Sequence, residues 1–538
     1  MKNSLYFGDN LDVLRESIKD QTIDLIYLDP PFNSDRNYNI LFASPKGPSS
    51  EAQITAFQDS WHWGEQSERE FGEIVRGSNT HVSEIMQSFR HFLGENDLMA
   101  YTTMLANRLL ELHRVLKPTG SLYLHCDPTA SHYLKIILDG VFGRDSFRTE
   151  ISWKRSGAHN DAKQGRKQYG NVRDIIYFYT KSNTWMWNWL YTSYDEEYLR
   201  KSYRHVETGT GRRYRLDNLT GPGGAAKGNP SYEVLGVTRH WRYSQEKMQK
   251  LVEEGRVIQS NPGTVPAYKR YLDEMPGVGL QNDWQDITPA SGSEYLGYPT
   301  QKPLALLERI ITASSNENDV VLDPFCGCGT AVHAAQKLGR QWIGIDITHL
   351  AISLIEKRLK DGFAGIKFDV FGTPKDHAGA VHLALRDKYQ FQWWACSLVN
   401  AQPYQGKKKG ADSGIDGLIY FQDDSTTHKK IIVSVKGGDN VSVAMVRDVA
   451  HVVAREKAEI GLFVTLAAPT KPMLTEAVKE GYYTSPITGK SFPTLQILTI
   501  EGLMTGTERA LYPDLSQGST TFKKAKVEEK TVDQKKMF

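Results

Sequence analysis

The sequence predicts an α/β protein in which parallel strands alternate with helices. Three observations support this fold class. The apolar run from Ile23 to Leu28 is typical of a buried strand. A second apolar run, Val320 to Leu322, leads into a glycine-bearing loop, a helix-like stretch and another strand. Between residues 97 and 142, segments with a helical period alternate with a short strand, as they do in layered α/β domains.

The first strand ends in Asp29-Pro30-Pro31-Phe32, the most informative motif of the chain. Two consecutive prolines can neither continue a sheet ladder nor enter a helix interior, so the strand must stop there. The turn places a carboxylate, a carbonyl and an aromatic ring at the carboxyl edge of the sheet, where open α/β sheets bind ligands. These groups suit a planar ring with an exocyclic amine. Taken alone, the motif is equally compatible with an ordinary strand-ending turn.

The next elements follow from their periodicity. The spacing of apolar residues predicts an amphipathic helix from Asp97 to Leu116, ended by Lys117-Pro118-Thr119-Gly120. Ser121 to His125 predicts a strand, and Ser131 to Phe142 predicts another helix.

The second motif is the loop Asp323-Pro324-Phe325-Cys326-Gly327-Cys328-Gly329-Thr330. A helix-like stretch from Ala331 to Leu338 follows it, and then a strand that ends in Asp346. Glycines let backbone N–H groups approach a ligand, and a terminal acid accepts hydrogen bonds from ribose hydroxyls. The layout indicates a nucleotide-type cofactor site, with a ligand-free tight turn as the alternative. A zinc site is disfavoured because the two cysteines lack partner cysteines nearby.

Together these segments resemble the motifs of DNA amino-methyltransferases that use S-adenosylmethionine. Asp29-Pro30-Pro31-Phe32 is similar to their catalytic motif, and the loop from Asp323 to Thr330 is similar to their cofactor loop. Gly8-Asp9-Asn10 and the segment from Tyr298 to Pro303 resemble two further cofactor-binding segments. The catalytic motif precedes the cofactor loop, an order that marks the β group of this family. The resemblance covers residues 1 to about 370.

The resemblance implies a Rossmann-like methyltransferase domain and methyl transfer to a base flipped out of double-stranded DNA. An Asp at the first motif position favours the N6 amine of adenine; the N4 amine of cytosine and an inactive DNA-binding scaffold stay open as alternatives. The implied catalytic residues are Asp29, Pro30, Pro31 and Phe32. The implied cofactor-binding residues are Asp9, Asn10, Thr300, Lys302, Asp323, Phe325, Gly327, Gly329, Thr330 and Asp346, and no metal is implied for methylation.

The C-terminal third resembles the core of Mrr-type restriction endonucleases, a smaller α/β fold. Their pattern is an Asp, a hairpin, and then an acid or Gln two residues before a Lys; here Asp416 and Lys436 match, whereas Ser434 takes the middle position. Gln392 stands where a second carboxylate could be. The Asp would hold a divalent cation such as Mg2+, but one carboxylate makes a poor magnesium site. Active cleavage, a DNA-binding relic and a partner-docking domain all stay open, and Lys407 to Lys409 are either phosphate contacts or a solvated loop.

Five segments are therefore expected. Residues 1–150 and 298–375 form the catalytic and cofactor-binding halves of the methyltransferase domain, and residues 151–297 lie between them as the target-recognition region. Residues 376–515 form the nuclease-like domain, and residues 516–538 form a disordered tail poor in apolar side chains. Within the recognition region, Trp185, Trp187 and Trp189 favour one face of a core strand over a base-stacking surface.

Composition sets limits on partners and compartment. The net charge is +2, so any DNA-binding surface must be local. Four cysteines in 538 residues and the absence of a signal-peptide pattern predict a cytoplasmic protein. No apolar run of about 18 residues occurs, so no membrane span is expected. Double-stranded DNA is the expected partner, with a second copy of the chain or a restriction subunit as further candidates.

Overall fold

The structure is a computed structural model of the 538-residue chain. It describes residues 2–31, 37–41, 53–58, 62–157, 167, 169–292, 294–298, 300–404, 414–423, 428–513 and 526–528. The described chain forms two compact units. One contains residues 1–188 together with the chain from Asn282 onward, and the other contains Trp189–Gln281.

A nine-stranded sheet organises the first unit. All neighbouring strands pair in parallel except β7, which runs antiparallel to both β5 and β6. The spatial order is β16 (Asp283–Trp284), β6 (Phe147–Lys154), β7 (Arg173–Thr180), β5 (Leu116–Cys126), β2 (Ile23–Leu28), β17 (Val320–Asp323), β18 (Gln341–Asp346), β1 (Ser4–Phe7) and β19 (Asp369–Phe371). Strands β2 and β17 are neighbours although about three hundred residues separate them in the chain, so the two sequence motifs meet at one edge.

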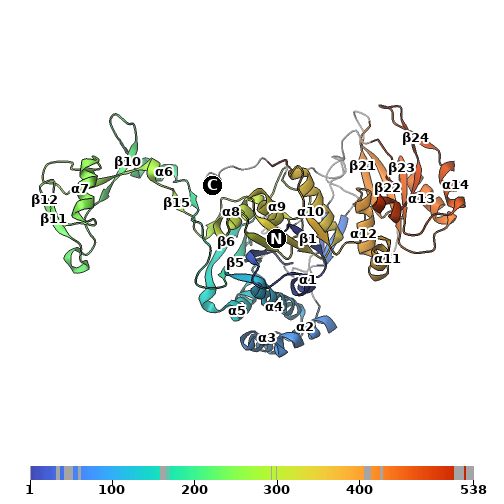
Figure 1. The fold of residues 1–538 in the computed structure, drawn as a ribbon, viewed down its shortest axis with the longest axis horizontal. Helices are drawn as coiled ribbons and strands as arrows, with labels where there is room; N and C mark the ends of the chain where they lie inside the picture. Colours follow the sequence, from blue (N-terminus) through green and yellow to red (C-terminus); the bar gives the residue numbers. More distant parts are fainter. Residues whose placement is uncertain are drawn as a thin grey trace. The chain divides into compact units, whose positions relative to one another are not determined.

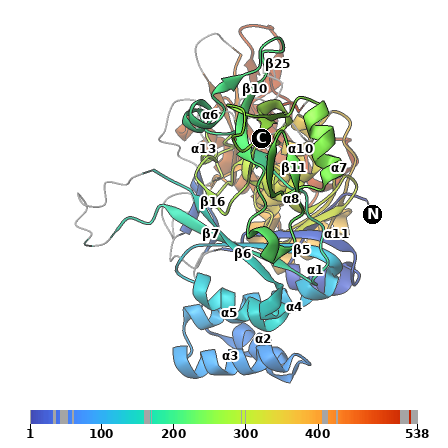
Figure 2. The same cartoon turned by 90° about the vertical axis from the view of Figure 1, so that its left-hand side faces the viewer.

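Helices cover both faces of this sheet (Figure 1). One face carries α8 (Leu304–Ser314), α9 (Thr330–Lys337) and α10 (His349–Gly362), and the other carries α1 (Asn10–Ser17), α4 (Asp97–Val115) and α5 (Ser131–Phe142). Outside α4 and α5 lies a further layer of α2 (Glu65–Arg76) and α3 (Thr80–Leu93), visible at the bottom of Figure 2. A hairpin of β3 (Asn37–Leu41) and β4 (Gln53–Gln58) follows the catalytic motif. The sheet is buried on both faces, which explains why its parallel strands are continuous apolar runs.

Most predicted elements of this unit are confirmed, and one boundary is wrong. Strand β2 and helix α5 have the predicted ends, and α4 ends one residue early at Val115. Strand β5, however, already begins at Leu116, so Lys117 to Gly120 do not form a separate turn. These residues lie in an irregularity of the β2–β5 ladder, where Ile23 pairs with Leu116 and Leu25 pairs with Ser121. A bulge of this kind accommodates a proline that a regular ladder would exclude.

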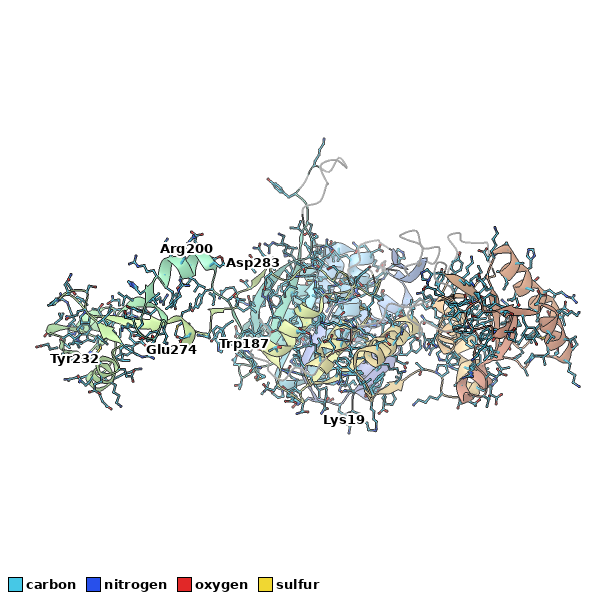
Figure 3. The ribbon with its side chains drawn as sticks, turned by 90° about the horizontal axis from the view of Figure 1, so that it is seen from above. Lys19, Trp187, Arg200, Tyr232, Glu274 and Asp283 are labelled. Carbon is cyan, nitrogen blue, oxygen red and sulfur yellow. The ribbon has the colours of Figure 1, made fainter. Side chains whose placement is uncertain are left out.

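The second unit is built from short strands and two helices. Its largest sheet has four strands, β13 (Val257–Ile258), β14 (Ala267–Tyr271), β10 (Arg213–Asn218) and β9 (His205–Val206). Helices α6 (Glu196–Ser202) and α7 (Gln245–Glu253) and a β-hairpin of β11 (Ser231–Val234) and β12 (Val237–His240) complete it. A small core forms around the fully buried Trp241. Figure 3 shows Arg200, Tyr232 and Glu274 on this unit.

The second unit is joined to the chain by a paired ribbon. Strands β8 (Tyr191–Thr192) and β15 (Val278–Gly279) are antiparallel, and the Leu280 N–H donates to the Leu190 carbonyl at 2.9 Å. The prediction that the three neighbouring tryptophans lie on a core strand is wrong. Residues 185–190 are not in a strand, and Trp187 and Trp189 are 37% and 70% exposed. Trp187 stacks on Phe178 instead, and Arg148 covers the Trp185 ring. The N–H groups of Met186 and Asn188 also donate to backbone carbonyls outside the segment, so these contacts rather than a sheet ladder hold it.

The C-terminal part has its own five-stranded sheet, in the order β20 (Gln402–Pro403), β21 (Gly417–Phe421), β22 (Lys429–Lys436), β23 (Ile460–Thr465) and β26 (Leu495–Thr499). One apolar core packs α11 (His377–Arg386), α12 (Lys388–Leu398) and α15 (Ile500–Thr505) on one face. A second core packs α13 (Val443–Arg455) and α14 (Lys471–Lys479) on the other. A two-stranded ribbon of β24 (Tyr482–Thr484) and β25 (Ser491–Pro493) completes this part. The predicted hairpin from Gly417 to Lys436 is confirmed.

The structure describes residues 526–528 of the predicted tail, and Glu528 has defined contacts. The Glu528 N–H donates to the Gly362 carbonyl at the end of α10, at 3.0 Å. The Glu528 carboxylate contacts His333 Nε2 at 3.2 Å and Lys337 Nζ at 3.4 Å, both on α9. Glu528 is therefore held against α9 and the end of α10 by these contacts. For the other tail residues the assignment stays a prediction.

Candidate active site

Acidic residues gather where four neighbouring parallel strands end. Asp29 follows β2, Asp323 and Asp346 end β17 and β18, and Asp9 follows β1 by two residues. Carboxyl ends of parallel strands share one edge of a sheet, so these side chains border the same crevice. A cavity of about 330 Å3 lies there, and all four aspartates line it.

Asp29 has one oxygen engaged and one without a partner. Lys302 Nζ donates to Asp29 Oδ2 at 2.5 Å, and both side chains are largely buried. Asp29 Oδ1 is buried, and no hydrogen-bond partner for it exists among the described residues. A buried acceptor without a donor is costly unless a ligand supplies one. Pro30 and Pro31 line the cavity beside it.

The glycine loop after β17 is held by the acid at the end of β18. Gly327 has φ +51°, a left-handed conformation that side chains rarely adopt, and its N–H donates to Asp346 Oδ2 at 2.9 Å. A Cβ at Gly327 would also lie 3.3 Å from the ring of Tyr298. The other oxygen of Asp346 accepts hydrogen bonds from the N–H and hydroxyl of Thr348, each at 2.9 Å. The loop backbone is therefore brought close to the cavity and fixed there.

The turn after β1 is fixed by a buried arginine of α4. Arg108 donates from Nη2 to both oxygens of Asp9, at 2.9 and 3.1 Å, and from Nε to Asn10 Oδ1 at 2.6 Å. Asn10 in turn donates to the Pro324 carbonyl at 2.8 Å, which ties this turn to the glycine loop. The side chain of Arg108 is 5% exposed, so these bonds are shielded from water.

The cavity favours a ligand with positive charge. Burial raises the pKa of Asp346 to about 6. Burial, reinforced by the negative charges of Asp29 and Asp346, also raises the pKa of Asp323 well above its usual range. A cation bound in the cavity would relieve this repulsion. Among the described residues, no group of three or more His, Cys, Asp or Glu side chains is placed to hold a metal ion.

The structure brings together nearly all of the residues that the sequence singles out. Those that line the cavity are Asp9, Asn10, Asp29, Pro30, Pro31, Thr300, Lys302, Asp323, Phe325, Gly327, Thr330 and Asp346. Gly329 stands behind them with φ +75°, and a Cβ there would lie 2.7 Å from Ile355. Phe32 lies outside the described residues. The roles assigned to all of these residues stay predictions.

Sequence reasoning missed Tyr27, Arg108 and Tyr298 as cavity residues. Tyr298 stands in the segment before Lys302 and could have been included with it. Arg108 gives a weaker signal, because it is a single cation among apolar neighbours such as Leu105 and Leu109 on α4. Tyr27 carries no signal in the sequence, since an aromatic residue in a buried strand is ordinary.

The Mrr-like residues of the C-terminal part do not form a metal site of the expected kind. Asp416 accepts hydrogen bonds from Gln392 Nε2 at 3.0 Å and from the Val435 N–H at 2.6 Å. The hydroxyl of Ser434, which is 2% exposed, lies 3.4 Å from the same carboxylate. Ser434 lies on β22, and Lys436 is the last residue of that strand. An amide and a hydroxyl thus stand where a divalent cation would need carboxylates, and these residues do not fit Mg2+. Lys407 to Lys409 lie outside the described residues.

Two protein-family models match the chain. The model described as "DNA methylase" matches residues 23–357, more than half of the sequence. The model described as "NACHT-associated inactive Restriction Endonuclease 1" matches residues 396–489. The first match contains the Asp29 turn and the glycine loop, and the second contains the hairpin from Gly417 to Lys436.

Curated relatives cover the same region. The type II methyltransferase M.EcaI of Enterobacter cloacae is 29% identical over 370 residues, which are 68% of this chain and 71% of that protein. The Mod subunit of the type III restriction-modification enzyme StyLTI of Salmonella typhimurium is 27% identical over 363 residues, 63% of this chain and half of that protein. The DNA adenine methyltransferase YhdJ of Escherichia coli is 25% identical over 356 residues, 66% of this chain and 82% of that protein.

Proposed function

The chain belongs to the DNA methylase family, and on that premise we propose that it methylates the exocyclic N6 amine of adenine in duplex DNA, with S-adenosylmethionine as donor. The observation that carries the proposal is the unpartnered, buried Oδ1 of Asp29 at the edge of the cavity. An exocyclic amine supplies the missing donor. Because a stacked base cannot reach a cavity of this kind, the target nucleotide must flip out of the duplex.

The cavity residues fit the cofactor. Acceptors for ribose hydroxyls come from Asp346, backbone N–H groups come from the loop around Gly327, and apolar surface comes from Phe325. Four aspartates line the cavity, and burial raises the pKa of Asp323 and of Asp346; for Asp323 the charges of Asp29 and Asp346 add to the effect, which a cationic ligand would offset. When bound, S-adenosylmethionine supplies a methyl group activated by its sulfonium.

The chain's own residues act on the target amine. We infer that Asp29 Oδ1 accepts one N–H and that the carbonyl of Pro30, which also lines the cavity, accepts the other, which favours a pyramidal and more nucleophilic nitrogen. Lys302 holds the second oxygen of Asp29 and so fixes the direction of the carboxylate. Positioning and electrostatics, rather than covalent chemistry by the protein, carry the rate.

The base is tested by product analysis. Genomic DNA that lacks methylated bases is incubated with the protein and labelled cofactor, digested to nucleosides and separated. We expect the label in N6-methyl-2′-deoxyadenosine, because an Asp, Asp29, stands at the first position of the motif. N4-methylcytosine, the alternative that the family also allows, would move the assignment to cytosine. Label in neither nucleoside would leave the DNA-binding scaffold as the better description.

We further propose that this methylation serves a restriction-modification or related defence system in the cytoplasm. Support comes from the relative StyLTI Mod, whose name describes it as a subunit of a type III restriction-modification enzyme. A separate restriction subunit or a second copy of this chain is therefore the partner to test. No described helix is long and apolar enough to cross a membrane.

We propose that the C-terminal part contacts DNA or a partner without cutting DNA. Support comes from its match to a family described as inactive, and from Gln392 and Ser434 at positions where cutting would need carboxylates. Incubating the protein with plasmid, in Mg2+ or Mn2+ and with or without prior methylation, tests this. Intact plasmid in every condition is the expected result, and metal-dependent cutting would contradict it.

A further inference from the structure

A chain of three buried polar side chains leads away from the cavity across the sheet. Tyr27 Oη on β2 lies 3.0 Å from His125 Nδ1 on β5, and His125 Nε2 lies 3.1 Å from Asp174 Oδ2 on β7. Each of the three residues is at most 2% exposed. The ring of Trp153 on β6 packs edge-on against His125, with 5.6 Å between ring centroids. The mechanism derived above uses none of these residues.

Asp174 determines which group donates in both hydrogen bonds, the one between Tyr27 and His125 and the one between His125 and Asp174. An ionised Asp174 can only accept, so His125 carries its hydrogen on Nε2, and Nδ1 is left as an acceptor. The Tyr27 hydroxyl must then donate to Nδ1. Although burial opposes charge on Asp174, the hydrogen bond from neutral His125 holds its pKa below the ordinary value, and Lys302 and Arg155 act in the same direction. Arg155 Nε pairs with the other oxygen of Asp174 at 3.1 Å.

Of the three side chains in this hydrogen-bonded series, Tyr27 is the one that lines the cavity. It stands two residues before Asp29, which follows β2 and lines the same cavity. Burial, together with the charges of Asp29, Asp323 and Asp174, raises the pKa of Tyr27 well above its usual value, so the phenol stays neutral. Its only hydrogen points to His125, which leaves the lone pairs of its oxygen for the cavity. Donation to His125 also makes that oxygen a better acceptor.

We propose that His125 and Asp174 are positioning residues for methyl transfer, which orient Tyr27 so that a lone pair of its oxygen faces the nitrogen of the target amine, in addition to the acceptors of Asp29 and Pro30. The inference rests on the proposed function. In the transfer, the amine nitrogen bonds to the methyl carbon, the carbon–sulfur bond breaks with its electron pair on sulfur, and the surplus amine proton leaves to water. Positive charge builds on the nitrogen before that proton leaves. A lone pair of the Tyr27 oxygen, already oriented by His125, stabilises this positive charge without any rearrangement of the site.

Four variants of the full chain test the proposal. Tyr27→Phe removes the acceptor and keeps the ring, whereas His125→Gln and Asp174→Asn disturb the group that orients it. His113→Gln is the matched control: His113 on α4 packs edge-on against Phe142 of α5, at 5.0 Å between centroids, and burial lowers its pKa to about 4. Single-turnover methyl transfer to unmethylated genomic DNA is measured together with calorimetric cofactor affinity and melting temperature.

We expect each of the first three variants to slow single-turnover transfer by about tenfold, while cofactor affinity stays unchanged. Tyr27→Phe combined with His125→Gln should be no slower than Tyr27→Phe alone, because both remove one interaction. His113→Gln should transfer at the wild-type rate. A purely structural network would instead lower the melting temperature and leave the rate of the folded enzyme unchanged.

Two results would overturn the proposal. One is wild-type transfer by folded Tyr27→Phe, and the other is a double variant whose slowing is the product of the two single effects. Because Tyr27→Phe keeps the ring and its packing, it tests the idea even where His125→Gln fails to fold. Nitrogen-15 NMR of labelled histidine gives a second readout, since hydrogen on Nδ1 of His125 would reverse the inferred direction. Absence of transfer by the wild-type chain would count against the proposed function instead.

Discussion

Asp29 has one carboxylate oxygen bound to the protein and one that is left for the proposed substrate. Lys302 holds Oδ2 at 2.5 Å, and Oδ1 is buried without a described partner. Because the donor for Oδ1 is absent from the described fold, the residue is specialised for a ligand rather than for stability. Substitutions at Asp29 should therefore separate chemistry from cofactor binding.

Asp29→Ala should reduce methyl transfer by about a hundredfold or more, because it removes a fixed acceptor from the charge that develops on the amine. Cofactor affinity should stay close to wild type, because the glycine loop and Asp346 are untouched. Tritiated methyl incorporation and calorimetric titration measure the two effects. Asp29→Asn is the control for folding, since it leaves an oxygen that can accept the hydrogen bond from Lys302. Equal losses of affinity and turnover would remove the role assigned to Asp29.

Asp346 predicts a pH dependence of cofactor binding. Burial raises its pKa to about 6, so below that pH the free enzyme carries a protonated acid that accepts ribose hydroxyls poorly. Affinity for S-adenosylmethionine should fall as pH decreases from 7 to 5, by up to about tenfold per unit. Because the Asp346 carboxyl binds a proton more tightly in the folded than in the unfolded protein, it contributes to the free energy of unfolding below about pH 4. That contribution is lost as the pH rises through about 6. Titrations of wild type and Asp346→Asn check this; an equal slope in both would exclude Asp346 as the cause.

At the scale of elements, the β21–β22 hairpin keeps a nuclease-like layout while its carboxylate serves the fold. Asp416 accepts from Gln392 and from the Val435 N–H, so it joins α12 to β22. A second acid beside Asp416 would repel it in a buried strand unless a cation lies between them. The hairpin therefore offers a direct test of the nuclease-like assignment.

Ser434→Glu should lower the melting temperature, because it buries a second negative charge next to Asp416. Mg2+ or Mn2+ should restore part of that loss, since two carboxylates make a better site than one. Wild-type protein should show no metal-dependent shift, and methyl transfer should be the same in both proteins. Melting curves with and without metal measure the effect. A folded variant that gains no metal affinity would count against the nuclease-like reading of the hairpin.

The sequence could predict elements whose ends are marked locally. Strand β2 stops at two prolines, and helix α5 ends at Gly143 with φ +86°. It could also predict Asp29, Asp323 and Asp346 as site residues, because acids at the ends of parallel strands must share an edge. It could not predict the bulge in β5 or the position of Trp187, which depend on partners far along the chain. The contacts of Arg108 and Glu528 are long-range for the same reason.

At the scale of the whole molecule, the chemistry and the insertion occupy different compact units. Every residue that lines the cavity belongs to the first unit, whereas Trp189–Gln281 form the second. The predicted role of the second unit is to recognise the target sequence. Its paired ends allow that role to be tested by excision.

Replacing Tyr191 to Gly279 with Asn-Gly should close the ribbon between Leu190 and Leu280, which already share a hydrogen bond of 2.9 Å. Cofactor affinity should stay unchanged, because the cavity loses no residue. Methylation at specific sites should be lost, because the predicted reading surface is gone. Calorimetry and sequencing of modified bases in treated genomic DNA measure the two effects. If the shortened protein still modified the same sites, recognition would have to lie elsewhere.

The ribbon at Leu190 and Leu280 also bears on how such enzymes diversify. The chain leaves and re-enters the first unit at one hydrogen-bonded rung, so a recombination event needs only two matched breakpoints to exchange everything between them. If the second unit recognises the target sequence as predicted, such an exchange would give a lineage a new target in a single step, while the cavity and Asp29 stayed under unchanged selection.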